Sequence, residues 1–394
     1  MSVAVSSRMA RVKPSATAML LARAKALQAE GHDVVSMAAG EPDFDTPEAI
    51  KNAARHAIDI GDTKYTALDG TAALKQAIID KFKNENGLDY APSQIVVSNG
   101  AKQCLFSACM GLLESGDEAI VPAPYWVSYP DMVRLAGADP VIVSTSIDDG
   151  FKMTPQQLDA ALTDKTRIVF LNSPSNPTGS AYTKEELVAL GAVIANYPTL
   201  AVLSDEIYEH IYWADEPYTS FAAACPDLYD RTLTINGVSK AYAMTGWRIG
   251  YVAGPDEAIR AVRTVQSQCT SNAGSVSQAA SVEALSGDQT PVREMCAAYR
   301  ERHDFVVQAL NDIDGFECRP GEGTFYAFPR ISGALEQLGY STDAEFAEML
   351  IEKVRLVTVP GSAFGAPGYL RLSFATSMEE LREALSRLKK AIVA

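Results

Sequence analysis

Short apolar runs recur along the first two thirds of the chain, and most intervals between them carry the periodicity of helices. The runs are rich in valine, isoleucine and leucine, which is typical of strands buried on both faces. Strands that alternate with helices form a parallel sheet covered on both sides. The pattern therefore predicts an α/β domain with a mainly parallel, seven-stranded sheet, whose strands lie at residues 94–98, 118–122, 140–144, 167–171, 200–204, 231–236 and 248–253.

The last two runs are expected to pair differently from the others. Only about a dozen residues separate them, which is too few for the helical crossover that parallel neighbours require. We therefore predict that these two strands run antiparallel. The longer intervals have room for helices, and segments with helical periodicity occur at residues 102–113, 155–162, 184–196 and 255–269.

The two ends of the chain break this alternation. After about residue 299 the helices and short strands follow a different order, which predicts a smaller α+β domain. Its elements are expected at residues 299–312, 342–354, 355–359, 369–374 and 377–391. At the start, a predicted helix over 17–30 ends at Gly31. We expect an N-terminal arm and helix that join the small domain (1–44), a large cofactor-binding domain (45–290) and a small C-terminal domain (291–394), with the polar stretch 286–291 as the joint.

Charge narrows the range of functions. The chain of 394 residues carries 34 lysines and arginines against 49 acidic residues, a net charge of −15 and a pI near 4.8. Such a field repels phosphate backbones and anionic lipid, so we expect neither nucleic-acid binding nor a membrane partner. No apolar run approaches the roughly 18 residues of a membrane helix.

The cysteines and the N-terminus bear on location. The six cysteines are scattered without a C-x-x-C pair, which indicates reduced thiols in a cytoplasmic protein, with no disulfide frame and no metal site. Residues 1–29 contain basic but no acidic side chains, a bias that resembles a transit peptide. The alternative, an ordinary helix rich in alanine and leucine, is the one we favour.

A lysine in the loop between the last two strands is the first candidate for chemistry. Lys240 lies between Gly237 and Gly250, so the sequence delivers it close to the interior of the sheet. Burial disfavours the ammonium form, and a neutral lysine is a nucleophile that forms Schiff bases. The alternative from this stretch alone is a solvated loop lysine.

Other strand ends carry complementary groups. Ligands of open α/β sheets bind beyond the carboxyl ends of the strands. Gly100 follows one strand and opens a helix, which suits a phosphate, although an ordinary turn would look the same. Asn176 lies in a loop rich in proline and asparagine, and Asp205 ends a buried strand, where a structural salt bridge is the alternative. There is no G-x-G-x-x-G, so a nicotinamide cofactor has no motif support.

Together these groups match the needs of pyridoxal 5′-phosphate. The lysine can hold the aldehyde, and a carboxylate such as Asp205 can keep the pyridine nitrogen protonated. An amide (Asn176) and a phenol (Tyr208) can bind the ring oxygen, and an arginine (Arg248) can fork the phosphate. The sequence therefore predicts a pyridoxal-phosphate enzyme.

Five motifs carry a resemblance to a known family. They are AGEPDF (39–44), NSPSNPTG (172–179), SDEIY (204–208), SKAYAMTGWRIG (239–250) and YLRLSF (369–374). From about Arg11 to its end, the chain resembles the class I aminotransferases of the fold-type-I pyridoxal-phosphate enzymes, and most of all the bacterial aspartate and prephenate aminotransferases. The resemblance implies a homodimer that transfers amino groups between L-aspartate or L-glutamate and 2-oxo acids, with prephenate as a further acceptor.

The resemblance also implies roles for individual residues. Lys240 resembles the Schiff-base lysine and proton carrier, Asp205 the partner of the ring nitrogen, and Tyr208 a donor to the ring oxygen. Arg371 resembles the fork for the substrate α-carboxylate, helped by Gly40 and Asn176. The remaining cofactor contacts are expected from Gly100, Ala101, Lys102, Trp126, Ile207, Ser239, Arg248 and, from the neighbouring subunit, Tyr65.

Two further features of the site follow from the resemblance: a departure from the family pattern beside the phosphate, and a subsite for a distal carboxylate. Many relatives have a serine where this chain has Gly237, so one phosphate hydrogen bond is either missing or supplied by Ser239. Ser15, Thr17 and Lys102 resemble the groups that meet the distal carboxylate of a dicarboxylic substrate, while the alternative assigns Ser15 to helix capping and Lys102 to the phosphate.

Three other functions stay open at this point. The same scaffold could host an aminotransferase for aromatic or neutral amino acids, or a β-lyase, which needs no amino acceptor. An aminotransferase-like regulator would carry a helix-turn-helix module, for which we see no room ahead of Arg11.

Overall fold

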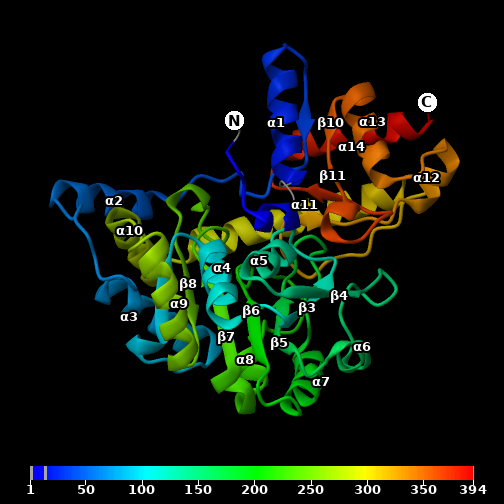
Figure 1. Ribbon diagram of the computed structural model, residues 1–394. Helices are drawn as coiled ribbons and strands as arrows, with labels where there is room; N and C mark the ends of the chain where they lie inside the picture. Colours follow the sequence, from blue (N-terminus) through cyan, green and yellow to red (C-terminus); the bar gives the residue numbers. More distant parts are fainter. Residues whose placement is uncertain (1–2, 13–15, 394) are drawn as a thin grey trace.

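A computed structural model describes residues 3–12 and 16–393, with the side chains of residues 16–19, 21 and 393 left out. Its centre is a seven-stranded sheet in the order β2-β8-β7-β6-β5-β3-β4 (Figure 1). The strands are β2 (Ile95–Ser98), β3 (Glu118–Ala123), β4 (Asp139–Ser144), β5 (Thr166–Asn172), β6 (Ala201–Asp205), β7 (Thr232–Gly237) and β8 (Gly250–Ala253). The predicted seven-stranded sheet is confirmed.

Strand direction follows the lengths of the connections. β4, β3, β5, β6 and β7 are parallel, each to the next. β8 is antiparallel to both β7 and β2, because the short connection after β7 holds no crossover helix. The predicted antiparallel pair is confirmed. β8 begins at Gly250 rather than at residue 248, since Arg248 has a φ of 55°, a left-handed conformation that a strand does not accommodate.

Helices cover both faces of this sheet, in agreement with the near-continuous burial along its central strands. In β5, Ile168 and Phe170 pack on one face with α4, α5 and α9, while Val169 and Leu171 pack on the other with α6, α7 and α8. A further group, α2, α3 and α10, packs near β2 and β8. The helices are α2 (Glu48–Asp59), α3 (Ala72–Lys81), α4 (Ala101–Leu112), α5 (Tyr129–Ala136), α6 (Pro155–Ala161), α7 (Lys184–Ala195), α8 (Phe221–Ala224), α9 (Asp256–Cys269) and α10 (Ser275–Ser286).

The C-terminal part is a smaller α+β unit that α1 and β1 join (Figure 1). β1 pairs in parallel with β10, and β11, β12 and β9 form an antiparallel sheet. The domain boundaries at residues 44 and 290 stay a prediction. The elements are α1 (Ala16–Ala29), β1 (Val35–Ser36), α11 (Thr290–Asn311), β9 (Tyr326–Ala327), α12 (Ser332–Leu338), α13 (Asp343–Val354), β10 (Leu356–Val357), β11 (Val359–Pro360), β12 (Leu370–Ser373) and α14 (Met378–Val393).

One predicted helix boundary is wrong. The helix expected at 299–312 begins at Thr290, so the polar stretch taken as a joint is partly helical. Pro291 lies in the first turn of α11, where a proline costs no hydrogen bond because the first N–H groups of a helix have no internal partner. Its presence therefore marks the start of the helix rather than a break before it.

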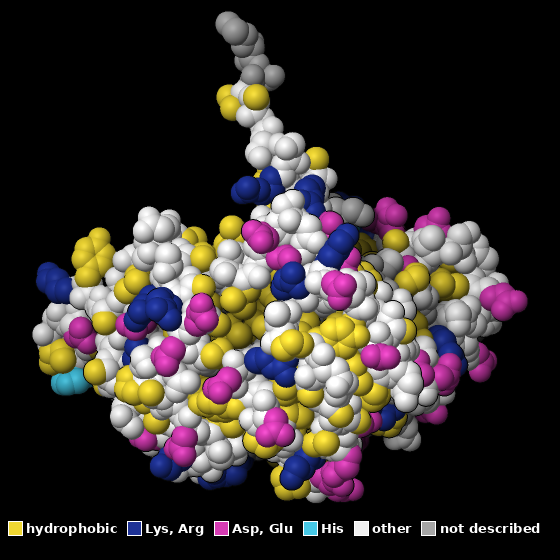
Figure 2. Space-filling model, turned by 60° about the horizontal axis from the view of Figure 1, so that its bottom comes forward, with side chains coloured by type: hydrophobic (Ala, Val, Ile, Leu, Met, Phe, Trp, Pro, Cys, Tyr) yellow, Lys and Arg dark blue, Asp and Glu magenta, His cyan; other side chains and the backbone are white. Residues whose placement is uncertain are grey.

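Acidic and basic side chains are interspersed over the face shown in Figure 2, which presents no broad basic surface. None of the helices within 3–12 and 16–393 combines the length and the apolar character needed to cross a membrane.

Candidate active site

A cavity of about 530 Å³ opens at the carboxyl ends of the central strands. Its wall includes residues from the sheet loops, from α4 and from the small C-terminal sheet, so both parts of the molecule contribute. The predicted site residues that line it are Gly40, Ala101, Lys102, Trp126, Asn176, Asp205, Ile207, Tyr208, Ser239, Lys240, Arg248 and Arg371.

Lys240 lies in the cavity after β7 and is half-buried. Its Nζ donates a hydrogen bond of 2.5 Å to the carbonyl oxygen of Gly40. Burial, reinforced by the charge of Arg371, lowers the pKa of Lys240 to about 8. A solvated lysine would keep its ordinary pKa, so the structure favours the nucleophile interpretation over the solvated-loop alternative.

Asp205 ends β6 and is buried. Its Oδ2 accepts a hydrogen bond of 2.6 Å from the Tyr129 hydroxyl, and its Oδ1 accepts one of 3.4 Å from the backbone N–H of Ile207. Burial raises the pKa of Asp205 to about 6, against the effect of the Tyr129 hydrogen bond. Among the described residues Asp205 forms no ion pair, so the structural salt-bridge alternative finds no support.

Arg371, on β12, brings a buried cation to the opposite wall. Its Nη1 donates to Asn176 Oδ1 at 3.0 Å, and its Nη2 donates to the carbonyl of Ala38 at 2.9 Å. The guanidinium lies over the ring of Tyr326, 4.4 Å from its centroid, and its Nε has no hydrogen-bond partner among the described residues. A buried cation with neutral partners is costly unless an anion joins it. The geometry therefore suits the binding of a carboxylate.

The end of the cavity beside α4 suits an anion other than a carboxylate. Gly100 has a φ of 87° and precedes α4, whose first N–H groups point out of the helix. The Arg248 guanidinium packs against Gly100, so closely that a Cβ there would collide with it. Arg248 Nη1 donates to the Thr245 carbonyl at 2.9 Å and Nη2 to the Asn99 carbonyl at 3.3 Å. A helix N-terminus beside an arginine has the chemistry that suits a phosphate.

Lys102 and Trp126 lie beside this anion site. Lys102 Nζ is 4.8 Å from the centroid of the Trp126 ring, a cation–π contact. Burial, followed by the charge of Arg248, lowers the pKa of Lys102. Lys102 is therefore a second cation at this end of the cavity, in addition to Arg248.

Close strand packing explains why a glycine stands at position 237. A Cβ on Gly237 would lie 2.9 Å from both Gly250 Cα and the Ile249 carbonyl oxygen. Any larger residue would push β8 away from β7. Ser239, two residues on, is buried and lines the cavity, where its hydroxyl can serve an anion.

Three predicted site residues are not placed in the cavity by the described structure. The Tyr65 side chain is 92% exposed and does not line the cavity. Ser15 lies outside the described residues, and so does the side chain of Thr17, although its backbone belongs to α1. Their assignments stay predictions.

The structure also adds residues that the sequence reasoning missed. Tyr129 bonds to Asp205, and the Tyr326 hydroxyl lies 3.2 Å from that of Tyr208. Asn172 Oδ1 accepts the backbone N–H of Asn176 and so fixes that loop. Tyr129 lies one helical turn after Trp126, which was a usable signal, but Tyr326 comes from a distant element with no local signal. Lys25, Glu41 and Thr245 are further polar residues of the cavity wall.

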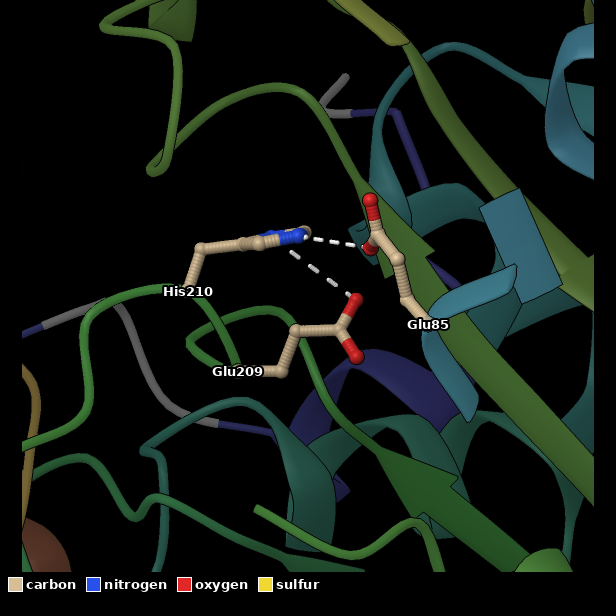
Figure 3. Close-up of side chains that lie close together, drawn as sticks. All are labelled: Glu85, Glu209 and His210. Atoms are coloured by element: carbon tan, nitrogen blue, oxygen red, sulfur yellow. Dashed lines mark hydrogen bonds and ion pairs between the residues drawn. The ribbon is translucent and has the colours of Figure 1, made fainter. Parts of the chain in front are cut away.

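A cluster of charged residues lies just beyond Tyr208. Figure 3 shows the His210 ring facing the carboxylates of Glu85 and Glu209, at 2.8 Å from Nε2 and 3.8 Å from Nδ1 respectively. The spacing would suit a metal, but the buried Lys81 ammonium already pairs with Glu209. Asn86 and Asn236 also donate to Glu209. The cluster therefore holds its own cation and anchors the turn that carries Tyr208.

Comparison with known proteins places the chain in an aminotransferase family. A family model described as "Aminotransferase class I and II" matches residues 32–388. The chain is 50% identical to the aspartate/prephenate aminotransferase of Nitrosomonas europaea and 51% identical to that of Cereibacter sphaeroides, over 98% of each chain.

Solved structures agree. The crystal structure of the aspartate aminotransferase from Rhizobium meliloti superposes with a TM-score of 0.96 at 47% identity, covering 100% of this chain and 99% of that one. The aspartate aminotransferase from Thermus thermophilus with maleate gives a TM-score of 0.94 at 41% identity, covering 99% and 100%.

Proposed function

Because this chain belongs to the class I and II aminotransferase family, we propose that it transfers amino groups between L-aspartate or L-glutamate and 2-oxo acids, with pyridoxal 5′-phosphate as cofactor. The observation that carries the proposal is the buried Arg371, whose guanidinium faces the same cavity as Lys240 without an anionic partner. An α-carboxylate bound there would lie in the same cavity as Lys240, whose lowered pKa suits proton transfer.

The residues of the cavity fit pyridoxal phosphate. Gly100, the first turn of α4 and Arg248 would hold the phosphate, and Trp126 would stack on the ring. Asp205 would pair with the ring nitrogen, while Tyr208 and Asn176 would serve the ring oxygen. When bound, this group supplies an electron sink for the charge left on the substrate Cα.

Lys240 has two tasks on this proposal. Its Nζ would hold the cofactor by its aldehyde and, once the substrate amine has taken its place, the free amine would accept the proton from the substrate Cα. A depressed pKa suits both tasks, because a useful fraction of the side chain is neutral near pH 7. Arg371 meanwhile orients the substrate by its α-carboxylate.

Lys102 supports a dicarboxylic substrate. With Arg248 assigned to the phosphate and Arg371 to the α-carboxylate, Lys102 is a further cation in the cavity wall. A second carboxylate would satisfy it, whereas an alanine side chain would not. Ser15 and Thr17 are proposed to complete this subsite. The printed names of the relatives also include prephenate, which we propose as a second acceptor.

The main test is spectroscopic. The visible absorption band of the cofactor-loaded protein should disappear on addition of L-aspartate and return on addition of 2-oxoglutarate. A band that ignores aspartate but disappears with aromatic or neutral amino acids would reassign the substrate. Release of a 2-oxo acid without any amino acceptor would favour a β-lyase. Failure of prephenate to restore the band would remove prephenate from the proposal.

We also propose a cytoplasmic homodimer in which Tyr65 reaches the neighbouring subunit's phosphate. The exposure of Tyr65 and the six free cysteines support this assignment. Mixing inactive Lys240→Ala subunits with weakly active Tyr65→Phe subunits should restore activity, because each hybrid dimer then contains one intact site. Activity that never exceeds that of the Tyr65→Phe protein would argue against a shared site.

A further inference from the structure

Tyr129 joins two of the cavity residues that matter most. It is the first residue of α5 and is 3% exposed. Its hydroxyl donates 2.6 Å to Asp205 Oδ2, and its ring meets the Trp126 ring edge-on with centroids 5.4 Å apart. On the far side it stacks on Phe170 at 4.9 Å. One buried side chain is therefore packed against the aromatic wall and bonded to the carboxylate.

The hydrogen bond from Tyr129 is the principal support of the Asp205 carboxylate. Among the described residues, the only other donor to this carboxylate is the Ile207 backbone N–H at 3.4 Å, on the other oxygen. A short hydrogen bond to a carboxylate is about twice as strong as one between neutral groups. Tyr129 thus fixes the orientation of the carboxylate in a site where no ion pair does so.

We propose that Tyr129 is a positioning residue that holds Asp205 as an anion directed at the nitrogen of the cofactor ring, and so keeps the proton on that nitrogen. The inference rests on the proposed function, since it concerns how Asp205 serves pyridoxal phosphate. The phenol lowers the basicity of the carboxylate, so the shared proton stays on the ring and does not move to Asp205.

The ionisation of the two groups agrees with this role. Burial and the nearby charge of Asp205 raise the pKa of Tyr129 well above its usual value of 10, so the phenol keeps its proton and stays a donor. The Tyr129 hydrogen bond is the largest influence that opposes the upward shift of the Asp205 pKa caused by burial. Lys240 also lowers the pKa of Asp205, but its ammonium is consumed when it binds the cofactor aldehyde.

The experiment compares the wild type with Tyr129→Phe, which keeps the ring packed on Phe170 and removes only the hydroxyl. Tyr182→Phe is the matched control, because its hydroxyl accepts a hydrogen bond of 2.8 Å from the backbone N–H of Met153 rather than bonding to Asp205. Each protein is loaded with pyridoxal phosphate labelled with ¹⁵N in the ring. Nuclear magnetic resonance then reports the protonation of the ring nitrogen, and maleate binding reports the substrate subsites.

In Tyr129→Phe we expect the ¹⁵N resonance to move towards the position of an unprotonated pyridine, with maleate affinity unchanged within about twofold. The rate of the first half-reaction should fall by roughly tenfold to a hundredfold, the effect of one lost charge-assisted hydrogen bond. Tyr182→Phe should match the wild type in all three measurements.

An unchanged ¹⁵N resonance in Tyr129→Phe would overturn the inference, whatever happens to the rate, because a purely structural role would slow the reaction without moving the proton. A loss of maleate affinity equal to the loss of rate would also overturn it. If the wild type itself failed to bind pyridoxal phosphate, the proposed function would fail and the positioning role with it, whereas an unchanged resonance in loaded Tyr129→Phe would remove the positioning role alone.

Discussion

The depressed pKa of Lys240 gives the most direct test of the site. At pH 7 a lysine with a pKa of about 8 is neutral in roughly one molecule in ten. A lysine with the ordinary value of 10.5 is neutral in only about one in three thousand. The cavity thus increases the population of nucleophilic lysine at neutral pH by about three hundredfold. The pKa falls because burial and the charges of Arg371 and Arg248 disfavour the ammonium more strongly than Glu41 and Asp205 favour it.

Competitive acetylation measures this pKa without the cofactor. Cofactor-free protein is treated with a trace of acetic anhydride between pH 6 and pH 11, and the modification of Lys240 is quantified by mass spectrometry. Labelling should rise with pH, with its midpoint near pH 8, and level off at higher pH. In Arg371→Leu the midpoint should move upward, because one of the two nearby cations is gone.

A midpoint near 10.5 in the wild type would refute the reasoning, since it would mean that Lys240 is solvated in the protein. A midpoint that stays the same in Arg371→Leu would assign the whole shift to burial. Lys240→Ala supplies the background, because any signal it retains comes from other lysines in overlapping peptides.

The remaining predictions concern stability, binding and specificity. Lys81→Met should lower the free energy of unfolding in urea by about 3–5 kcal/mol, because it leaves the buried Glu209 carboxylate without its cation, and adding Glu209→Gln should recover part of the loss. Maleate at a hundred times its Kd should stabilise the wild type by about 2.7 kcal/mol in the same assay, and this gain should vanish in Arg371→Leu. Lys102→Ala should reduce kcat/KM for L-aspartate at least tenfold more than for L-alanine, an estimate of about 1.4 kcal/mol for one charged contact; equal losses would contradict the distal-carboxylate assignment. Lys240→Ala should abolish steady-state transamination while its circular dichroism spectrum stays that of the wild type.

The sheet could be predicted from the sequence because its signals are local. Each strand is a short apolar run, and the seven predicted runs correspond to the seven observed strands with shifts of a residue or two. The antiparallel pairing of β7 with β8 followed from the length of one connection. The wrong prediction for the start of α11 also came from a local signal. A polar segment with a proline was interpreted as a joint between domains, whereas the proline lies in the first turn of the helix.

The candidate site likewise contains residues that local sequence signals identify and contacts that they do not. Lys240, Asp205 and Asn176 lie at strand ends or in distinctive loops, so chain order alone indicates that they meet. The pairs that orient them join residues far apart in sequence: Tyr129 and Asp205 are 76 positions apart, and Tyr208 and Tyr326 are 118 apart. Such contacts depend on tertiary packing, which periodicity and propensity do not encode.

Charge placement explains why the cavity sits between the two parts of the molecule. Lys240 comes from the large sheet and Arg371 from the small one, and neither has an anionic partner among the described side chains that bond to it. The chain bears a net charge of −15, so neutralising carboxylates were abundant in composition. Two buried cations held by carbonyl and amide oxygens instead keep their attraction for an anion that arrives from solution. The carboxylate of Asp205, by contrast, accepts a hydrogen bond from the Tyr129 phenol and forms an ion pair with neither cation. A zwitterionic substrate and a charged ring both require opposite charges that are held apart in one cavity. Burying these charges lowers the stability of the fold, and the packing of the surrounding sheet and helices must compensate for that loss.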